Sequence, residues 1–299
     1  MVVRLLGLGA VGAPLAVRLA PVSSFGILLS QDRVAKYEAE GCTVNGVRYD
    51  FPVITEKESA DLIIIACKNT DLSDALDTIA PHVGENTCLM SLLNGIESER
   101  VLSERFSPSN VIYSFITNLS SVREGRKIDC FSPKGGLVLF NEKDGKPSRR
   151  IDAIDELFTC AGIWHEIPHD IIHEMWWKFA FNICVNSLSA VMNLTYSDMN
   201  SNESFYRLVR MLYREIRTVA AAEGIILSDR DEEKCFEVLR NMDGPGKTSM
   251  LQDIEAHRVS ENRYFSLSLS DMGRRHSIAT PLCDFLYQLV EAKSDAGKS

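Results

Sequence analysis

A lysine and two asparagines recur at every fourth position in one apolar segment of the chain. They are Lys178, Asn182 and Asn186, and almost all residues between them are apolar or aromatic. On an α-helix, positions four apart lie along one face, with a drift of about 40° per step. Burying an ammonium group and two carboxamides is unfavourable unless hydrogen-bonding partners are present. The stripe predicts either a site for a small oxo acid, which would supply those partners, or a hydrogen-bond network between domains.

A glycine pattern at the start of the chain indicates a second kind of chemistry. The apolar run Val2 to Leu6 leads into Gly7-Leu8-Gly9-Ala10-Val11-Gly12, and helical spacing follows from Ala13 to Leu19. In a dinucleotide-binding turn the first glycine permits a tight turn, the second lets a pyrophosphate approach the backbone, and the third allows close packing of strand and helix. Residues 7–12, including Leu8, Ala10 and Val11, are therefore predicted to bind a dinucleotide, with helix N–H groups facing the phosphates.

The residues after the second predicted strand bear on the choice of cofactor. The sequence there is Leu29-Ser30-Gln31-Asp32-Arg33. If Ser30 is the first residue beyond the strand, Ser30 and Arg33 suit a ribose 2′-phosphate; if the strand ends later, Asp32 suits a free 2′-hydroxyl. We expect Ser30 and Arg33 to bind the cofactor, which favours NADPH over NADH.

Two polar residues follow apolar runs in the first half of the chain. Lys68 comes directly after a run that ends at Cys67, and Asn94-Gly95 follows Leu92-Leu93. In an open parallel sheet, ligands bind at the carboxyl ends of the strands. Lys68 and Asn94 are therefore candidate ligand-binding residues, although each also suits an ordinary turn.

The wider pattern predicts an α/β Rossmann-type N-terminal domain with a parallel sheet, followed by a mainly α-helical C-terminal domain. We place the dinucleotide-binding domain at residues 1–166 and the helical substrate and catalytic domain at residues 167–299. Predicted strands span residues 2–7, 26–29, 62–67, 87–92, 111–116, 126–130 and 136–140, and predicted helices span residues 171–192, 204–223, 231–241 and 255–276.

Composition narrows the classes of protein to which the chain could belong. With 299 residues, a net charge of −9 and 45% hydrophobic residues, it suits a globular protein without a broad surface for nucleic acid or an anionic membrane. No apolar run approaches the roughly 18 residues of a membrane span. Eight scattered cysteines favour reduced thiols in the cytoplasm. His165, His169 and His173 are spaced by four residues, but Pro168 interrupts the helix that would bring them to one face, so no metal site is predicted. Assembly into a homodimer is compatible with the sequence.

Taken together, these segments resemble the ketopantoate reductase (2-dehydropantoate 2-reductase) family. That family combines an N-terminal GxGxxG, a lysine after a strand, an NG pair, a WxKxxxNxxxN helix and a late SxxxD segment followed by a glutamate. The matching residues here are Gly7, Gly9, Gly12, Lys68, Asn94, Gly95, Trp176, Lys178, Asn182, Asn186, Ser249, Asp253 and Glu261.

The resemblance implies NADPH-dependent reduction of 2-dehydropantoate to pantoate, a step of pantothenate biosynthesis. It implies that Lys178 is the general acid and that Glu261 orients the substrate or the lysine. Substrate-binding roles fall to Asn94, Asn182, Asn186 and Ser249, and cofactor contacts also to Lys68, Asn94 and Glu261. Hydride delivery to a ketone builds negative charge on its oxygen, which a lysine ammonium both stabilises and protonates.

One departure from the family pattern concerns the substrate. Family members usually carry an IDYING-like run after the glutamate, whereas this chain has Asn262-Arg263-Tyr264-Phe265-Ser266-Leu267. A relative that reduces another small 2-oxo acid is therefore the first alternative. A non-catalytic NADPH-binding sensor is the second, and it would not need Lys178, Asn94 and Ser249 to converge.

Overall fold

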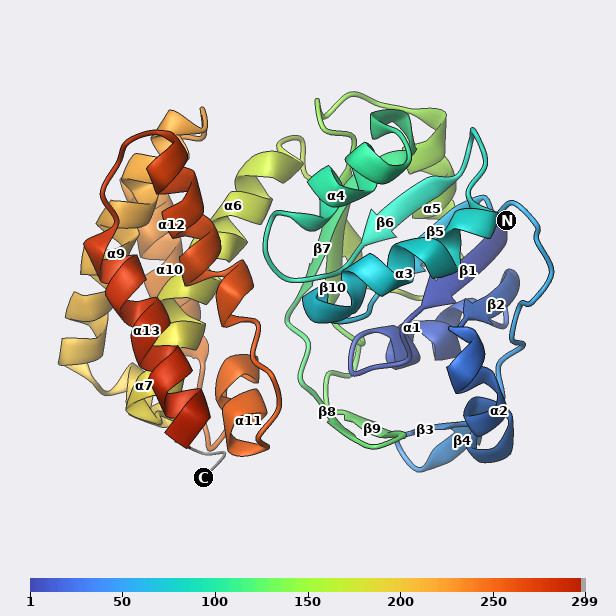
Figure 1. The fold of residues 1–299 in the computed structure, drawn as a ribbon, viewed down its shortest axis with the longest axis horizontal. Helices are drawn as coiled ribbons and strands as arrows, with labels where there is room; N and C mark the ends of the chain where they lie inside the picture. Colours follow the sequence, from blue (N-terminus) through green and yellow to red (C-terminus); the bar gives the residue numbers. More distant parts are fainter. Residues whose placement is uncertain (297–299) are drawn as a thin grey trace. The chain divides into compact units, whose positions relative to one another are not determined.

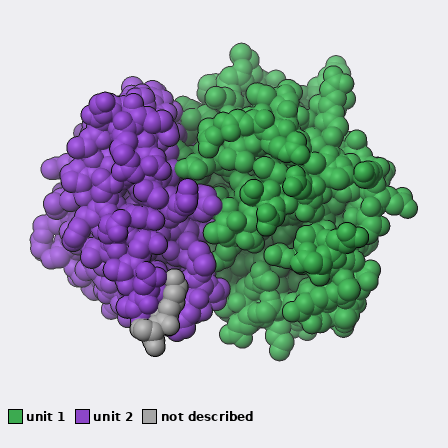
Figure 2. All heavy atoms as spheres, viewed as in Figure 1, with its two compact units in different colours: residues 1–172 green, residues 173–299 purple. Residues whose placement is uncertain are grey.

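The chain folds into two compact units, residues 1–172 and the part that starts at His173 (Figure 2). This computed structural model describes residues 1–296. The boundary lies a few residues beyond the expected position at 166. The segment in between stays with the first unit because the Asn141 side-chain amide donates to the carbonyl oxygen of Pro168 at 2.8 Å and the backbone of His169 lies against Gly145.

A seven-stranded sheet organises the first unit (Figure 1). Its strands are β1 (Val2–Leu6), β2 (Ser24–Leu28), β5 (Leu62–Ile65), β6 (Cys88–Ser91), β7 (Val111–Thr117), β10 (Leu137–Asn141) and β11 (His165–Glu166). They lie in the order β11-β10-β7-β6-β5-β1-β2. Neighbours from β2 to β7 pair in parallel, whereas β10 is antiparallel to β7. The predicted α/β fold is confirmed, with a sheet that is mostly rather than wholly parallel.

Helices cover both faces of this sheet. They are α1 (Gly12–Leu19), α2 (Gln31–Glu40), η1 (Asn69–Asp71), α3 (Leu72–Ile79), η2 (Ala80–His82), α4 (Ser98–Arg105), η3 (Pro108–Asn110) and α5 (Arg149–Cys160). Ile64 of β5 belongs to a core cluster with α1 and α5, and its neighbour Ile63 to a second cluster with α3 and α4. Successive strand residues point to opposite faces, so a strand covered on both sides needs the unbroken apolar run that β5 has.

A second, four-stranded sheet lies in the same unit in the order β4-β3-β9-β8 (Figure 1). Its strands are β3 (Cys42–Val44), β4 (Val47–Tyr49), β8 (Ser121–Glu124) and β9 (Lys127–Cys130). Of these, the sequence predicted only β9. The others were missed because three or four residues are too few for a clear alternating pattern, although Asn45-Gly46, with φ of 49° and 80°, is a typical hairpin turn.

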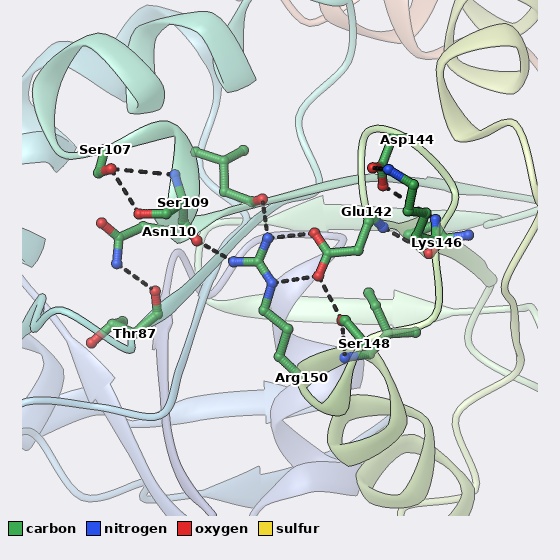
Figure 3. A network of polar contacts seen from close by, with 12 residues as sticks. Thr87, Ser107, Ser109, Asn110, Glu142, Asp144, Lys146, Ser148 and Arg150 are labelled. Atoms are coloured by element: carbon green, nitrogen blue, oxygen red, sulfur yellow. Dashed lines mark hydrogen bonds and ion pairs between the residues drawn. The ribbon is translucent and has the colours of Figure 1, made fainter.

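A polar network closes the amino-terminal edge of the large sheet (Figure 3). Arg150 donates to the Glu142 carboxylate and to the carbonyl oxygens of Ser109 and Val111. Ser148 also donates to Glu142, at 2.6 Å, and caps α5. Burial raises the pKa of Glu142, but hydrogen bonds from Arg150 and Ser148 outweigh it and hold that pKa below its usual value. The network ties the start of β7 to β10 and α5, at the edge opposite the glycine turn.

The second unit is helical. It contains all but the first two residues of α6 (Ile171–Phe181), a π-helix (Asn182–Ser187), α7 (Leu188–Met192), α8 (Tyr196–Asn200), α9 (Glu203–Ala222), α10 (Asp229–Asn241), α11 (Ser249–Glu255), η5 (Asn262–Tyr264), α12 (Ser266–Arg275) and α13 (Pro281–Ala296). The mainly α-helical domain is confirmed. The prediction of one helix over residues 255–276 is wrong, because residues 256–265 form a loop and the short turn η5 between α11 and α12. No helix within residues 1–296 is both long and apolar enough to cross a membrane.

Candidate active site

The three glycines of the first turn have three different surroundings. Gly7 has φ of 101°, and a Cβ on it would lie 2.6 Å from the backbone of Ala66. A Cβ on Gly12 would lie 1.9 Å from the carbonyl oxygen of Gly7. A Cβ on Gly9 would meet only the Arg123 guanidinium, at 3.8 Å, among the described residues. Gly7 and Gly12 are therefore required by the fold, whereas Gly9 is not, and a glycine at this position of a dinucleotide-binding turn lets a pyrophosphate approach the backbone.

The glycine turn stands where the strand order reverses. β1 lies between β2 and β5, so the turn after β1 and the segment after β5 are neighbours at the carboxyl edge, where ligands bind in sheets of this kind. Lys68, after β5, and Asn94, after β6, are both half-buried at this edge. The Asn69 side-chain amide donates to the Asn94 carbonyl oxygen at 2.8 Å and so joins the two segments. Asn69 is buried and was not predicted; its position directly after Lys68 was the available signal.

The residues expected to distinguish NADPH from NADH lie at the start of α2. β2 ends at Leu28, so Leu29 is the first residue beyond the strand and Ser30, the N-terminal flanking residue of α2, is the second. Neither condition is met: Ser30 is not the first residue beyond the strand, and the strand does not end later, as the assignment to Asp32 requires. The choice between Ser30 with Arg33 and Asp32 stays a prediction. Asp32 and Arg33 are both exposed in the first turn of α2, and the Ser30 hydroxyl holds the pKa of Asp32 below its usual range.

The lysine and asparagine stripe spans a change in helix type. Lys178 lies in α6, whereas Asn182 and Asn186 lie in the π-helix. The expectation of a continuous α-helix over residues 171–192 is therefore wrong at residues 182–187. A π-helix bonds residue i to residue i+5, and such segments often mark functional sites. Its widened turn leaves Asn186 Nδ2 3.4 Å from Asn182 Oδ1.

Burial sets these three side chains apart from their neighbours. Within residues 175–190 every residue is buried except Lys178 and Asn186, which are half-buried. Asn182 is only 6% exposed, and its Nδ2 is buried with no hydrogen-bond partner among the described residues. An unpaired buried amide donor is unfavourable by about 1–3 kcal/mol, and a ligand oxygen would remove that penalty.

Ser249 lies beside the same helical run. It is the exposed first residue of α11, which packs on α7 and the π-helix. The preceding residue, Thr248, has its hydroxyl 2.8 Å from that of Ser189, and Ser189 donates to the carbonyl oxygen of Asn186 at 3.1 Å. This chain of bonds holds Ser249 near Asn186. Asp253, the last residue of the SxxxD segment, forms an ion pair with Arg258 at 2.7 Å.

Glu261 is followed by a residue whose anchoring role the sequence did not show. Glu261 is half-buried and directly precedes η5. The next residue, Asn262, is fully buried, and its Nδ2 donates to the carbonyl oxygen of Tyr287 at 3.0 Å and to the Glu291 carboxylate at 2.9 Å. These bonds anchor η5 to α13. Asn262 was missed because α13, which supplies both acceptors, was not predicted.

Comparison with known proteins decides the family. Residues 3–139 match the family model "Ketopantoate reductase PanE/ApbA", and residues 170–294 match "Ketopantoate reductase PanE/ApbA C terminal". The chain belongs to the ketopantoate reductase family. It is therefore an oxidoreductase that uses a pyridine nucleotide.

Individual relatives agree with this assignment. A 2-dehydropantoate 2-reductase from Lactococcus lactis is 27% identical over 251 residues, which cover 82% of this chain and 79% of the relative. The solved 2-dehydropantoate 2-reductase of Geobacter metallireducens superposes with a TM-score of 0.83 at 25% identity, covering 97% of this chain and 99% of that one. D-mandelate dehydrogenase in complex with NADH superposes with a TM-score of 0.86 at 25% identity, covering 99% of both chains.

Proposed function

We propose that the chain reduces 2-dehydropantoate to pantoate with NADPH, in pantothenate biosynthesis. The observation that carries this proposal is the helical run in the second unit. There, Lys178 and Asn186 are the half-buried residues of an otherwise buried segment, and Asn182 keeps a buried amide donor without a partner among residues 1–296. A lysine cation beside two neutral amides suits a small anion that carries a ketone.

The proposed chemistry divides the roles among these side chains. A reduced nicotinamide, when bound, would supply a hydride to C2 of the oxo acid. Lys178 stabilises the negative charge that develops on the ketone oxygen and donates a proton to it, so the product is the 2-hydroxy acid. Asn182 and Asn186 hold the substrate without neutralising the lysine. Ser249 binds the same molecule, and Glu261 orients the substrate or the lysine.

The cofactor contacts follow from the first unit. The glycine turn at residues 7–12, with Lys68 and Asn94 at the same edge of the sheet, would hold the dinucleotide. Arg33 and Ser30 would bind a ribose 2′-phosphate, which is why we propose NADPH. Asp32, exposed in the same turn, is the residue that would instead suit NADH.

A second candidate function is the reduction of a bulkier 2-oxo acid with NADH. The superposition on D-mandelate dehydrogenase in complex with NADH favours it. So does the segment after Glu261, where the buried Asn262 and the exposed Arg263 stand in place of the usual apolar and acidic residues. The two candidates share Lys178 and differ in the side chain of the acid and in the cofactor.

A two-by-two assay separates the candidates. Purified protein would be given NADPH or NADH with either 2-dehydropantoate or phenylglyoxylate, and oxidation of the cofactor followed by absorbance. The proposal expects the highest kcat/KM for NADPH with 2-dehydropantoate. A higher value for NADH with phenylglyoxylate would establish the second candidate. Tight NADPH binding without turnover of any 2-oxo acid would refute both and indicate a sensor.

The location and assembly of the protein belong to the same proposal. All eight cysteines are free thiols, and five of them are buried, which supports the reducing cytoplasm as the place of action. The homodimer stays a prediction, and sedimentation velocity of the purified chain would test it.

A further inference from the structure

An arginine from the small sheet reaches the middle glycine of the cofactor turn. Arg123 lies on β8, the edge strand of the four-stranded sheet, and its Nε donates to the carbonyl oxygen of Gly125 at 2.8 Å. Its Nη1 lies 3.8 Å from the position that a Cβ on Gly9 would occupy. Arg123 and Gly9 are more than one hundred residues apart in sequence, so the two sheets of the first unit bring them together.

The position of Arg123 is held by the pairing of its strand. Arg123 lies opposite Ile128 in the antiparallel pairing of β8 with β9, and Ile128 is 1% exposed in the core. β9 in turn pairs in parallel with β3. Burial raises the pKa of Cys42 on β3, and the positive charge of Arg123 opposes that effect. The side chain therefore extends from a fixed strand toward the glycine turn.

Two other arginines of this region have partners away from the glycine turn. Arg18, on α1, donates to the carbonyl oxygens of Gly162 and Pro133. Arg126 forms an ion pair with Glu40 at 2.5 Å and lies over the ring of Tyr37. A dinucleotide pyrophosphate carries two negative charges, whereas the N-terminus of a helix offers only about half a positive charge. A guanidinium supplies a full charge and a planar pair of donors that match phosphate oxygens.

We propose that Arg123, whose guanidinium lies beside Gly9, binds the pyrophosphate of the nicotinamide cofactor. This inference rests on the proposed function only in that the glycine turn binds a dinucleotide. The pyrophosphate is common to NADPH and NADH. Arg123 therefore strengthens binding of both cofactors equally and takes no part in the choice between them, which falls to Ser30 and Arg33.

The test compares the variants Arg123→Ala and Arg123→Lys with a matched control, Lys127→Ala. Lys127 is an exposed cation on the same hairpin, directly opposite Glu124. Dissociation constants for NADPH, NADH and ADP-ribose would be measured by calorimetry on the full chain. We expect Arg123→Ala to weaken all three by the same factor, roughly 10- to 100-fold, because hydrogen bonds to charged groups are strong. Arg123→Lys should recover part of the loss, and Lys127→Ala should bind like the wild type.

Two further measurements keep the inference falsifiable. The melting temperature without ligand should be unchanged in Arg123→Ala, and the KM for the oxo acid at saturating cofactor should also be unchanged. A loss confined to NADPH would assign Arg123 to the 2′-phosphate and overturn the proposal, as would unchanged affinity for all three nucleotides. A wild-type chain that binds none of them would refute the proposed function and this inference together, whereas wild-type binding with an unaffected Arg123→Ala refutes the inference alone.

Discussion

Replacing Gly9 and Gly12 by alanine, one at a time, should distinguish a glycine that cofactor binding requires from a glycine that the fold requires. A methyl group on Gly9 meets the flexible end of Arg123 at 3.8 Å, an ordinary contact, and Gly9 has no positive φ. Gly9→Ala should therefore change the free energy of unfolding by no more than about 1 kcal/mol. The same methyl group fills the space above the turn. Forcing a phosphate against it costs about 1–3 kcal/mol, which is roughly a 5- to 150-fold loss of nucleotide affinity.

Gly12→Ala should act in the opposite way. Its methyl group would lie 1.9 Å from the Gly7 carbonyl oxygen and 3.2 Å from Ala66 Cβ, well inside the roughly 3.5 Å of an ordinary contact. Because the first of these atoms is backbone, α1 must move away from β1. We expect a loss of about 1–3 kcal/mol in stability and a melting temperature lower by roughly 2–12 °C.

Calorimetric titration with NADPH and thermal unfolding without ligand would measure both effects on both variants. The contrast between the two variants is the prediction. Two results would show that the pyrophosphate does not lie against Gly9. One is a Gly9→Ala variant with a melting temperature as low as that of Gly12→Ala. The other is a Gly9→Ala variant that binds NADPH like the wild type.

Three more predictions concern other parts of the chain. Lys178→Ala should lower kcat by roughly 10²- to 10⁴-fold while the dissociation constant of NADPH stays nearly unchanged, as stopped-flow and titration would show; unaltered turnover would reject Lys178 as the general acid. Ser30→Ala with Arg33→Ala should weaken NADPH by roughly 10-fold or more and NADH little, and equal losses would place the 2′-phosphate elsewhere. Glu142→Gln should reduce stability at neutral pH by about 1–3 kcal/mol in urea unfolding. The folded-state pKa of Glu142 is lowered, so its charge stabilises the fold at pH values above the unfolded-state pKa, and this stability is lost as pH falls through the folded-state pKa. The difference in unfolding free energy between wild type and Glu142→Gln should therefore vanish in acid. A difference that stays constant with pH would contradict the role of the charge.

The large sheet was predictable because its signal is local. The runs that became β1, β5, β6 and β7 are mostly apolar, and each was placed to within two residues. The small sheet was mostly missed. Its strands are short and partly exposed, and β3 is stabilised by a parallel partner, β9, that lies far away in sequence.

In the candidate site, too, some features were predictable from local sequence and others were not. The sequence showed a polar stripe in an apolar segment, formed by Lys178, Asn182 and Asn186. No local pattern in that segment predicted a π-helix. The widened turn forms where α9, α11 and α13 all pack against it. Asn69 was not predicted, and Asn262 was noted only as a departure from the family pattern, because the role of each depends on a carbonyl oxygen distant in sequence, at Asn94 and at Tyr287.

By itself, the sequence determined the α/β unit followed by a helical unit, the three glycines of the first turn and the polar residues along one helix. These features depend on periodicity and on residue type, which act within a few neighbouring positions. Only the tertiary structure decided that Ala66 presses on Gly7, that α13 anchors Asn262 and that Arg123 stands over Gly9. Such contacts join residues far apart along the chain, and they exist only once packing of the sheets and helices has brought the backbones together.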